Sequence, residues 1–305
     1  MEKSKKIWLD GKFVPWREAN VHVLTHTLHY GLGVFEGIRC YQIKKKKSAI
    51  FRLQEHVDRL FNSAIILGID IPFSKKEIFT TMLQVVRENE LDECYIRPIV
   101  FLGHNQMGLN PNGVDVRVAI AAWPWGAYLG DEGISQGIHA RISSFTRHHV
   151  NITMTRAKAC GYYVNSILAK AEAVRDGYDE AILLDPQGYV SEGSGENIFL
   201  LSKGRLKTPA LSCSNLEGIT RDSVFHIAKH LKIEIEEGCI TRDELYIADE
   251  VFLTGTAAEI TPIRKIDNRT ISNGKRGKTT ARIQKIFFEI VHGNHTKFKK
   301  WLTEV

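Results

Sequence analysis

Three short stretches of this sequence carry residue types that covalent chemistry on a small molecule requires. The first centres on Lys158, which stands between Ala157 and Ala159 within Met154–Gly161. Small neighbours leave room for a bulky group on the lysine amine, and a desolvated place favours the unprotonated amine that attacks a carbonyl. Lys158 is therefore a candidate nucleophile, although the octapeptide alone also fits a surface lysine that precedes a helix.

The second stretch holds two carboxylates. Glu192 and Glu196 flank Gly193-Ser194-Gly195 at the end of a predicted strand, so they need not have the same role. A carboxylate that faces a basic ring nitrogen keeps that nitrogen protonated. The alternative is a glycine-rich turn with two solvated acids. A dinucleotide-binding loop is disfavoured, because the third glycine is missing and the stretch runs into a strand instead of a helix.

The third stretch is a potential anion site. Gly218-Ile219-Thr220 stands where a helix over Thr220–Leu231 is predicted to begin, and the first turn of a helix offers N–H donors and the positive end of its dipole. A phosphate fits such a place. The alternative is a plain helix start with Thr220 as the N-cap residue. Arg59 could supply a matching cation, unless it only pairs with Glu55 on its own helix.

Strands and helices predicted before residue 123 form a first α/β domain. Ile7–Val14 reads as a hairpin, because its central Asp10-Gly11 is typical of two-residue turns. Arg52–Gly68 has apolar residues three to four positions apart, which predicts an amphipathic helix that ends at the glycine. The other elements expected here are a helix over Lys75–Glu90 and strands over Ile38–Ile43, Ala49–Phe51, Cys94–Leu102 and Val116–Trp123.

The stretch Trp123–Gly130 differs from both flanks in its aromatic, proline and glycine content, so we expect domains over 1–122 and 136–305 with a linker over 123–135. In the second domain the helix Gly161–Asp176 should have one apolar face. That face consists of Val164, Ile167, Leu168, Ala171 and Val174. The other elements expected there are the helix Thr220–Leu231 and strands over Ile138–Ser143, Ala181–Leu184, Tyr189–Glu192, Asn197–Leu201, Arg205–Thr208 and Glu250–Thr254.

The composition is that of an ordinary globular protein, with 43% hydrophobic and 25% charged residues. Apolar runs stop well short of the about 20 residues of a membrane span and no targeting segment is visible, so a cytoplasmic protein is expected. Five widely spaced cysteines indicate reduced thiols and no metal site. The net charge of +6 and the run Lys44–Lys47 suggest nucleic acid, but the run fits a solvated hairpin tip, so neither nucleic acid nor a membrane is the expected partner.

Each of the three stretches alone also fits a plain structural interpretation. Their order and spacing together favour the chemical one. The run Glu192–Phe199, followed by Leu206-Lys207-Thr208 and then Leu216–Arg221, resembles the signature of the class IV aminotransferases, which are pyridoxal 5'-phosphate (PLP) enzymes of fold type IV. The resemblance extends to Tyr30–Arg39, Tyr95–Pro98 and Gly255–Glu259, and so covers nearly the whole chain. It implies a two-domain fold, α/β plus α+β, with the cofactor in the cleft between the domains and the linker around Tyr128 closing over it.

The resemblance also implies a role for each cofactor-binding residue. Lys158 is similar to the catalytic lysine that forms the Schiff base with PLP and carries the substrate proton, and Glu192 to the partner of the pyridine nitrogen. Tyr163 corresponds to the residue that binds the phenolic oxygen. The residues implied to hold the phosphate or pack on the ring are Arg59, Leu216, Gly218, Ile219, Thr220 and Thr256.

Substrate residues follow from the same resemblance. Tyr95 and the N–H groups of Thr256 and Ala257 are implied to bind the α-carboxylate. Arg97 supplies a charge that the distal carboxylate of glutamate needs and an aliphatic side chain does not. The other residues implied to bind substrate are Tyr30, Phe35, Arg39, Leu109, Trp125, Tyr128 and Tyr163. Tyr30 and Leu109 are implied to come from the neighbouring subunit, so at least a homodimer is expected.

The motifs around Arg39, Arg97 and Gly255–Glu259 resemble the branched-chain members of the family. They imply reversible, ping-pong transamination of L-leucine, L-isoleucine and L-valine with 2-oxoglutarate. D-amino acid and R-amine transaminases share the lysine, the glutamate and the phosphate turn, and remain the alternative. From another class, a nucleic-acid-binding or cofactor-free structural protein would lack the absorbance of a bound cofactor. Cys160 and Tyr162 stand where Gly and Asn are common in relatives. The resemblance therefore does not predict how the side chains pack around these two residues.

Overall fold

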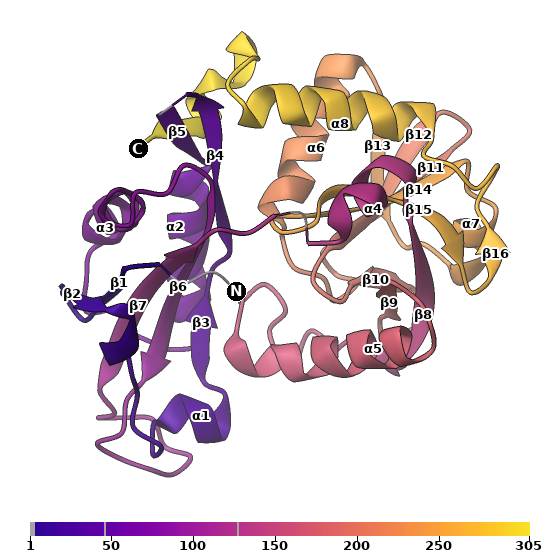
Figure 1. The fold of residues 1–305 in the computed structure, drawn as a ribbon. Helices are drawn as coiled ribbons and strands as arrows, with labels where there is room; N and C mark the ends of the chain where they lie inside the picture. The colour runs from indigo at the N-terminus through magenta and orange to yellow at the C-terminus, as the bar shows by residue number, and fades with distance from the viewer. Residues whose placement is uncertain (1–3, 46, 127) are drawn as a thin grey trace. The chain divides into compact units, whose positions relative to one another are not determined.

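The computed structural model describes residues 4–45, 47–126 and 128–305, which form two compact units (Figure 1). The first unit comprises residues 1–125, 157–162 and 289–305, and the second comprises 126–156 and 163–288. Each unit combines a β-sheet with helices, in agreement with the predicted mixture of α and β structure.

Within the described residues, the first unit has an antiparallel sheet of eight strands in the order β17-β5-β4-β6-β7-β1-β2, with β3 paired to β6. The predicted hairpin at the N-terminal end is confirmed, because Leu9 pairs with Lys12 and both Asp10 and Gly11 have positive φ. The strands are β1 (Lys6–Leu9), β2 (Lys12–Pro15), β3 (Gly33–Phe35), β4 (Ile38–Lys44), β5 (Lys47–Phe51), β6 (Cys94–Leu102), β7 (Val116–Trp123) and β17 (Leu302–Glu304). Lys46, in the predicted tip of the β4–β5 hairpin, lies outside the described residues.

Two long helices provide much of the first unit's core, α2 (Leu53–Ile66) and α3 (Lys75–Glu88). The apolar face predicted for α2 is buried, with Val57 and Leu60 at 0% exposure, and Gly68 follows at φ +67°. Fully burying one such side chain contributes about 1.5–3 kcal/mol. A capping box between Ser74 and Glu77 starts α3. Shorter elements of this unit are α1 (His26–Tyr30) and the 3-10 helices Trp16–Glu18, Cys160–Tyr162 and Thr296–Trp301.

The second unit has a mixed sheet. Its described part contains nine strands in the order β10-β9-β8-β15-β14-β11-β12-β13, with β16 paired to β15. The pairs β8–β9, β8–β15 and β12–β13 are parallel. The strands are β8 (Ile138–Thr146), β9 (Glu180–Leu184), β10 (Val190–Gly193), β11 (Asn197–Ser202), β12 (Arg205–Pro209), β13 (Ile235–Gly238), β14 (Glu250–Gly255), β15 (Glu259–Ile266) and β16 (Arg269–Thr270). The helices are α4 (Gly130–Gln136), α5 (Tyr163–Arg175), α6 (Ile219–Leu231), α7 (Arg242–Tyr246) and α8 (Lys278–Val291), the last of which continues past residue 288.

Helix α5 is buried through the face opposite to its large apolar residues. Val164 and Ile167 expose 61% and 63% of their surface, whereas Ala169 and Ala173 are fully buried. The two alanines pack against Ala181 and Leu183 on β9. Periodicity therefore located an apolar face, and the structure shows that the opposite face is the one that packs on the sheet.

None of the helices in the described ranges is long and apolar enough to cross a membrane.

Candidate active site

The backbone of Lys158 is held on both sides within the first unit. Its N–H donates to Ser63 Oγ on α2 at 3.0 Å, and its carbonyl accepts from the N–H of Phe35 at 3.1 Å. The flanking residues Ala157 and Ala159 are each 2% exposed. Lys158 is therefore half-buried between two buried alanines, which does not fit the alternative of a plain surface lysine.

Two glycines allow the lysine segment to approach the start of β3. The N–H of Gly161 donates to the carbonyl of Gly31 at 3.0 Å. Gly31 has φ +73°, and a Cβ built on it would lie 2.9 Å from the Cα of Gly161. Any larger residue at position 31 would be strained twice, by its backbone angle and by this contact.

The side chain of Lys158 leads to the predicted substrate residues of the same unit. Its Nζ lies 5.2 Å from the centre of the Phe35 ring, and the guanidinium carbon of Arg97 lies 4.6 Å from the same ring. The Arg97 guanidinium also lies 5.4 Å from the ring of Tyr95. Its Nε is buried and, among the described residues, has no hydrogen-bond partner. A buried donor in this state fits a site that receives an anion.

Tyr95 connects this group to two further residues predicted to bind substrate, Trp125 and Arg39. Its ring lies 4.6 Å from that of Trp125, whose carbonyl accepts from Arg39 Nη2 at 3.4 Å. The Tyr95 hydroxyl lies directly over Gly37, where a Cβ would come within 1.8 Å of the oxygen. Glycine at position 37 is thus a steric requirement for this placement of Tyr95.

Tyr30 and Leu109 lie apart from the contacts described so far. They expose 43% and 87% of their surface. Their segments are nevertheless joined, because Nε2 of His26 on α1 lies 2.8 Å from the carbonyl oxygen of Gly108.

Arg59 has a bidentate partner, and that partner is Glu36. The distances are 2.6 Å from Nε and 2.9 Å from Nη2 to the two carboxylate oxygens. Glu55, the alternative partner from sequence, instead accepts from Arg52 Nε at 2.8 Å.

In the second unit, Glu192 has a cation against one oxygen and an amide against the other. Arg147 Nε lies 2.9 Å from Oε1, and the N–H of Leu216 donates to Oε2 at 3.0 Å. Arg147 also donates from Nη1 to Asn165 and Ser166 in the first half of α5, the helix that Tyr163 begins. These contacts fix the direction of the Glu192 carboxylate.

The predicted anion site is built around Asn197. Its Nδ2 donates to the carbonyl of Leu216 at 2.8 Å, and a Cβ on Gly218 would come within 1.9 Å of its Oδ1. Gly218 is the N-cap residue and α6 begins at Ile219, so the alternative of Thr220 as N-cap is wrong. Ile219 and Thr220 are only 8% and 4% exposed, which keeps this helix start away from bulk water.

The end of β14 lies beside the same asparagine, because Asn197 pairs with Thr254 in the sheet. The Thr254 hydroxyl is buried and, within the described ranges, has no partner. Thr256 and Ala257 form the turn that follows β14. Tyr128 is less enclosed, with 39% exposure and the Lys170 ammonium 5.4 Å from its ring centre.

The second carboxylate of the motif differs from the first. Glu196 is buried, and its burial together with the negative charge of Glu180 raises its pKa to about 8. Glu196 is therefore mostly protonated at neutral pH. The structure separates the two acids, as their flanking positions suggested, into a neutral Glu196 and a Glu192 paired with Arg147.

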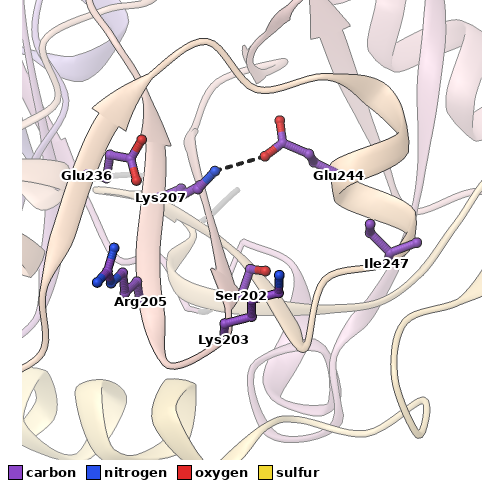
Figure 2. A pocket seen from close by; sticks show the side chains of 7 residues that line it. All are labelled: Ser202, Lys203, Arg205, Lys207, Glu236, Glu244 and Ile247. Atoms are coloured by element: carbon purple, nitrogen blue, oxygen red, sulfur yellow. Dashed lines mark hydrogen bonds and ion pairs between the residues drawn. The ribbon is translucent and has the colours of Figure 1, made fainter.

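A surface cavity of about 590 Å³ lies elsewhere in the second unit (Figure 2). Lys207 and Glu244 point toward each other across it and form an ion pair at 3.0 Å. Its lining residues are Ser202, Lys203, Arg205, Lys207, Glu236, Glu244 and Ile247. None of these seven is a predicted site residue.

The chain is similar to known proteins along nearly its whole length. The family described as Amino-transferase class IV matches residues 33–266. The branched-chain-amino-acid aminotransferase of Pseudomonas aeruginosa is 54% identical, over 100% of this chain and 98% of its own length. The chain belongs to the class IV aminotransferases.

Two solved structures of this family have nearly the same fold. The branched-chain amino acid aminotransferase of Escherichia coli has a TM-score of 0.96 and 47% identity, covering 98% of this chain and 99% of that one. The PLP form of the Thermobaculum terrenum enzyme has a TM-score of 0.93 and 37% identity, covering 100% of this chain and 99% of that one. The predicted family and fold type are thus confirmed, and branched-chain relatives favour the main interpretation over a D-amino acid transaminase.

Class IV aminotransferases use PLP, and the residues present fit that cofactor. Its phosphate needs N–H donors, which the enclosed start of α6 offers. Gly218 caps this helix at a point where any side chain would collide with Asn197. Its ring nitrogen needs an anion, for which Glu192 is oriented by two partners. Its aldehyde needs an amine with room around it, as at Lys158.

Four residues that contact predicted site residues or their partners were given no role by the sequence, namely Asn197, Arg147, Glu36 and, through Glu36, His56. Asn197 stands inside the signature, so its position was a usable signal. Arg147, Glu36 and His56 contact partners far away in the chain. Nothing local to them indicates those partners.

Proposed function

We propose that this aminotransferase transfers the α-amino group of L-leucine, L-isoleucine and L-valine to 2-oxoglutarate, giving branched-chain 2-oxo acids and L-glutamate. The observation that carries this proposal is the contact chain from Lys158 through Phe35 to Arg97. The Phe35 ring lies beside the amine, and the guanidinium that lies against the same ring has a buried Nε with no hydrogen-bond partner among the described residues. Such a site can accept an aliphatic side chain as well as the distal carboxylate of glutamate.

The residues that the family resemblance assigns to the cofactor would hold it. Arg59, the N–H groups of Ile219 and Thr220, and Thr256 would bind its phosphate, with Gly218 giving them access. Leu216 would pack on its ring and Tyr163 would bind its phenolic oxygen. When bound, PLP supplies the carbonyl that takes up the amino group and the ring that withdraws electrons from the substrate Cα.

Two side chains would control the protons of the reaction. The amine of Lys158 would take the proton from the substrate Cα and deliver it to the C4′ atom of the cofactor. Glu192, held by Arg147 and the Leu216 N–H, would keep the ring nitrogen protonated throughout. Fixed partners reduce the reorganisation that such a charge requires during the reaction.

The substrate would be oriented by its α-carboxylate. Tyr95 and the N–H groups of Thr256 and Ala257 would bind it, and Arg97 would bind the distal carboxylate of glutamate. The side chain would contact an apolar surface. Its members are Tyr30, Phe35, Arg39 through its aliphatic stem, Leu109, Trp125, Tyr128 and Tyr163.

A substrate panel with 2-oxoglutarate as acceptor tests this function. The three branched-chain L-amino acids should be converted, whereas D-alanine and R-amines should be converted at a small fraction of that rate. Preferential use of D-alanine or an R-amine would move the protein to the alternative specificity of the same fold.

We also propose that the enzyme works as a homodimer or a larger homo-oligomer. Exposed apolar side chains support this, namely Tyr30 and Leu109 in the first unit and Val164 and Ile167 on α5 in the second. Exposed apolar clusters are typical of protein interfaces. Sedimentation at micromolar concentration should give at least twice the chain mass of 34.6 kDa, and a monomer would contradict the proposal.

The remaining proposals concern organisation and location. The domain division into 1–122, 123–135 and 136–305 stays a prediction, which limited proteolysis can test. We place the enzyme in the cytoplasm. All five cysteines carry free thiols, as in proteins of reducing compartments, and this supports the placement.

A further inference from the structure

A fully buried carboxylate holds Arg59 by two atoms. Glu36 Oε1 accepts from Arg59 Nε and Glu36 Oε2 from Arg59 Nη2, and the side chains are 0% and 13% exposed. A bidentate pair of this kind fixes the plane of the guanidinium as well as its position. Arg59 therefore cannot turn its planar group without breaking two charge-assisted hydrogen bonds.

Further contacts hold the carboxylate itself. His56 Nδ1 lies 2.7 Å from Glu36 Oε2, and the N–H of Gly37 donates to the same oxygen at 3.3 Å. The backbone N–H of Glu36 donates to the carbonyl of Pro98 on β6 at 3.0 Å. Contacts from helix α2 and strand β6 thus keep Glu36 in place, so that it cannot follow a displaced Arg59.

The charges of this cluster cancel. Burial by itself raises the pKa of Glu36, but Arg59 and His56 together hold that pKa below its ordinary range. Burial lowers the pKa of His56, so its ring is neutral at neutral pH and must donate from Nδ1 to the ionised carboxylate. One negative charge on Glu36 faces one positive charge on Arg59.

Glu36 should have two opposite effects on the binding of a phosphate by Arg59, one through its charge and one through its geometry. Its negative charge offsets the positive charge of Arg59 and so weakens the attraction between Arg59 and a phosphate. Through its geometry it keeps the guanidinium oriented, so that less order has to be imposed when a ligand binds. The two effects predict opposite results when the charge is removed.

We propose that Glu36 is a positioning residue that holds the Arg59 guanidinium in the orientation in which it binds the phosphate of the cofactor. The inference rests on the proposed function, which assigns that phosphate to Arg59. On this view orientation outweighs the loss of attraction, and the Glu36–Arg59 pair is part of the phosphate site.

The test is Glu36→Gln, which preserves the size of the side chain but sets an amide N–H group against the donors of Arg59 or His56. Apoenzyme is titrated with PLP and with pyridoxal, which lacks the phosphate, so the ratio of the two Kd values isolates the phosphate contribution. We expect the variant to lower the preference for PLP by about ten-fold, with pyridoxal binding within about two-fold of wild type.

A matched control is Glu55→Gln, because Glu55 lies on α2, the helix that also carries Arg59. Glu55 pairs with Arg52 and its side chain is 39% exposed, so this variant removes a carboxylate from an arginine without touching the pair of Arg59. Its preference for PLP should equal that of wild type. A loss as large as that of Glu36→Gln would overturn the inference, because any nearby carboxylate would then suffice.

Three results with Glu36→Gln would also overturn it. A stronger preference for PLP would show that charge outweighs orientation. An unchanged preference would show that the pair has no effect on the phosphate. Equal losses for PLP and pyridoxal would show general structural damage. If Glu36→Gln does not fold, His56→Asn carries the same expected direction, and an unchanged preference there overturns the inference.

Arg59→Leu separates this inference from the proposed function. If Arg59 binds the phosphate, the variant lowers the preference for PLP, and adding Glu36→Gln to it lowers the preference no further. An Arg59→Leu variant with undiminished preference would remove Arg59 from the phosphate site, and the inference with it. A sensitive Arg59→Leu beside an insensitive Glu36→Gln would overturn the inference alone.

Discussion

Arg147 Nε lies 2.9 Å from Glu192 Oε1, and both side chains are buried in the second unit. The other oxygen of the same carboxylate accepts the N–H of Leu216 at 3.0 Å. Glu192 is thus held by one cation and one amide N–H that come from separate segments of the chain. An anion fixed in this way can act on a ring nitrogen without first rearranging.

Replacement of Glu192 by Gln should therefore impair the chemical step. We expect kcat with L-leucine and 2-oxoglutarate to fall by about 10²-fold or more, equivalent to about 3 kcal/mol. Glu196→Gln, which replaces a side chain that is mostly neutral at pH 7, should change kcat far less. If Glu196→Gln caused the larger loss, the roles of the two carboxylates would have to be exchanged.

The Arg147–Glu192 pair should behave as one unit. Arg147→Gln should lower kcat by a similar order to Glu192→Gln, and the double variant should be little worse than the worse single variant, because residues in direct contact are not additive. Steady-state kinetics of the four proteins measure this coupling. Multiplied losses in the double variant would show that Arg147 acts elsewhere.

Glu196 should make the protein less stable as the pH rises. Its folded pKa of about 8 lies above the ordinary value of 4.5, so between these two pH values the folded state binds more protons than the unfolded state. The stability contribution is complete below pH 4.5 and is lost as the pH rises through 8. Denaturant unfolding of apoenzyme at pH 5 to 8 should show a decline that Glu196→Gln reduces, and equal slopes in both proteins would contradict this.

Arg97 should distinguish the two amino donors. Arg97→Leu removes a charge-assisted contact of about 1.5–3 kcal/mol with the distal carboxylate of glutamate, which corresponds to about ten- to a hundred-fold. The single-turnover reaction with glutamate should slow by that factor, whereas the leucine reaction should stay within a few-fold of wild type. Equal losses with both donors would mean that Arg97 shapes the pocket as a whole.

Local features of the fold could be predicted from sequence because their causes are local. The Asp10-Gly11 turn needs only two residues with positive φ, and the helix over Leu53–Ile66 needs only its apolar period. Helix α5 shows the limit of this reasoning. Its small residues, not its large ones, face the sheet, and the choice depends on Ala181 and Leu183 of another strand.

Candidate site residues could be named from sequence where they stand in motifs. Lys158, Glu192 and Gly218 could be named because the three stretches that hold them occur together in the order and spacing of a family signature. The residues that orient them could not. Arg147 reaches Glu192 through the packing of separate segments. Such partners become visible only when the chain is folded.

Lys158 should bind the cofactor covalently, and one measurement tests this directly. Holoenzyme is reduced with borohydride, digested and mapped by mass spectrometry, with Lys158→Ala as the control. We expect phosphopyridoxyl on the peptide that contains Lys158 and none in the control, which should still bind PLP without turning over. Phosphopyridoxyl on any other lysine of the wild-type protein, or on none, would contradict it.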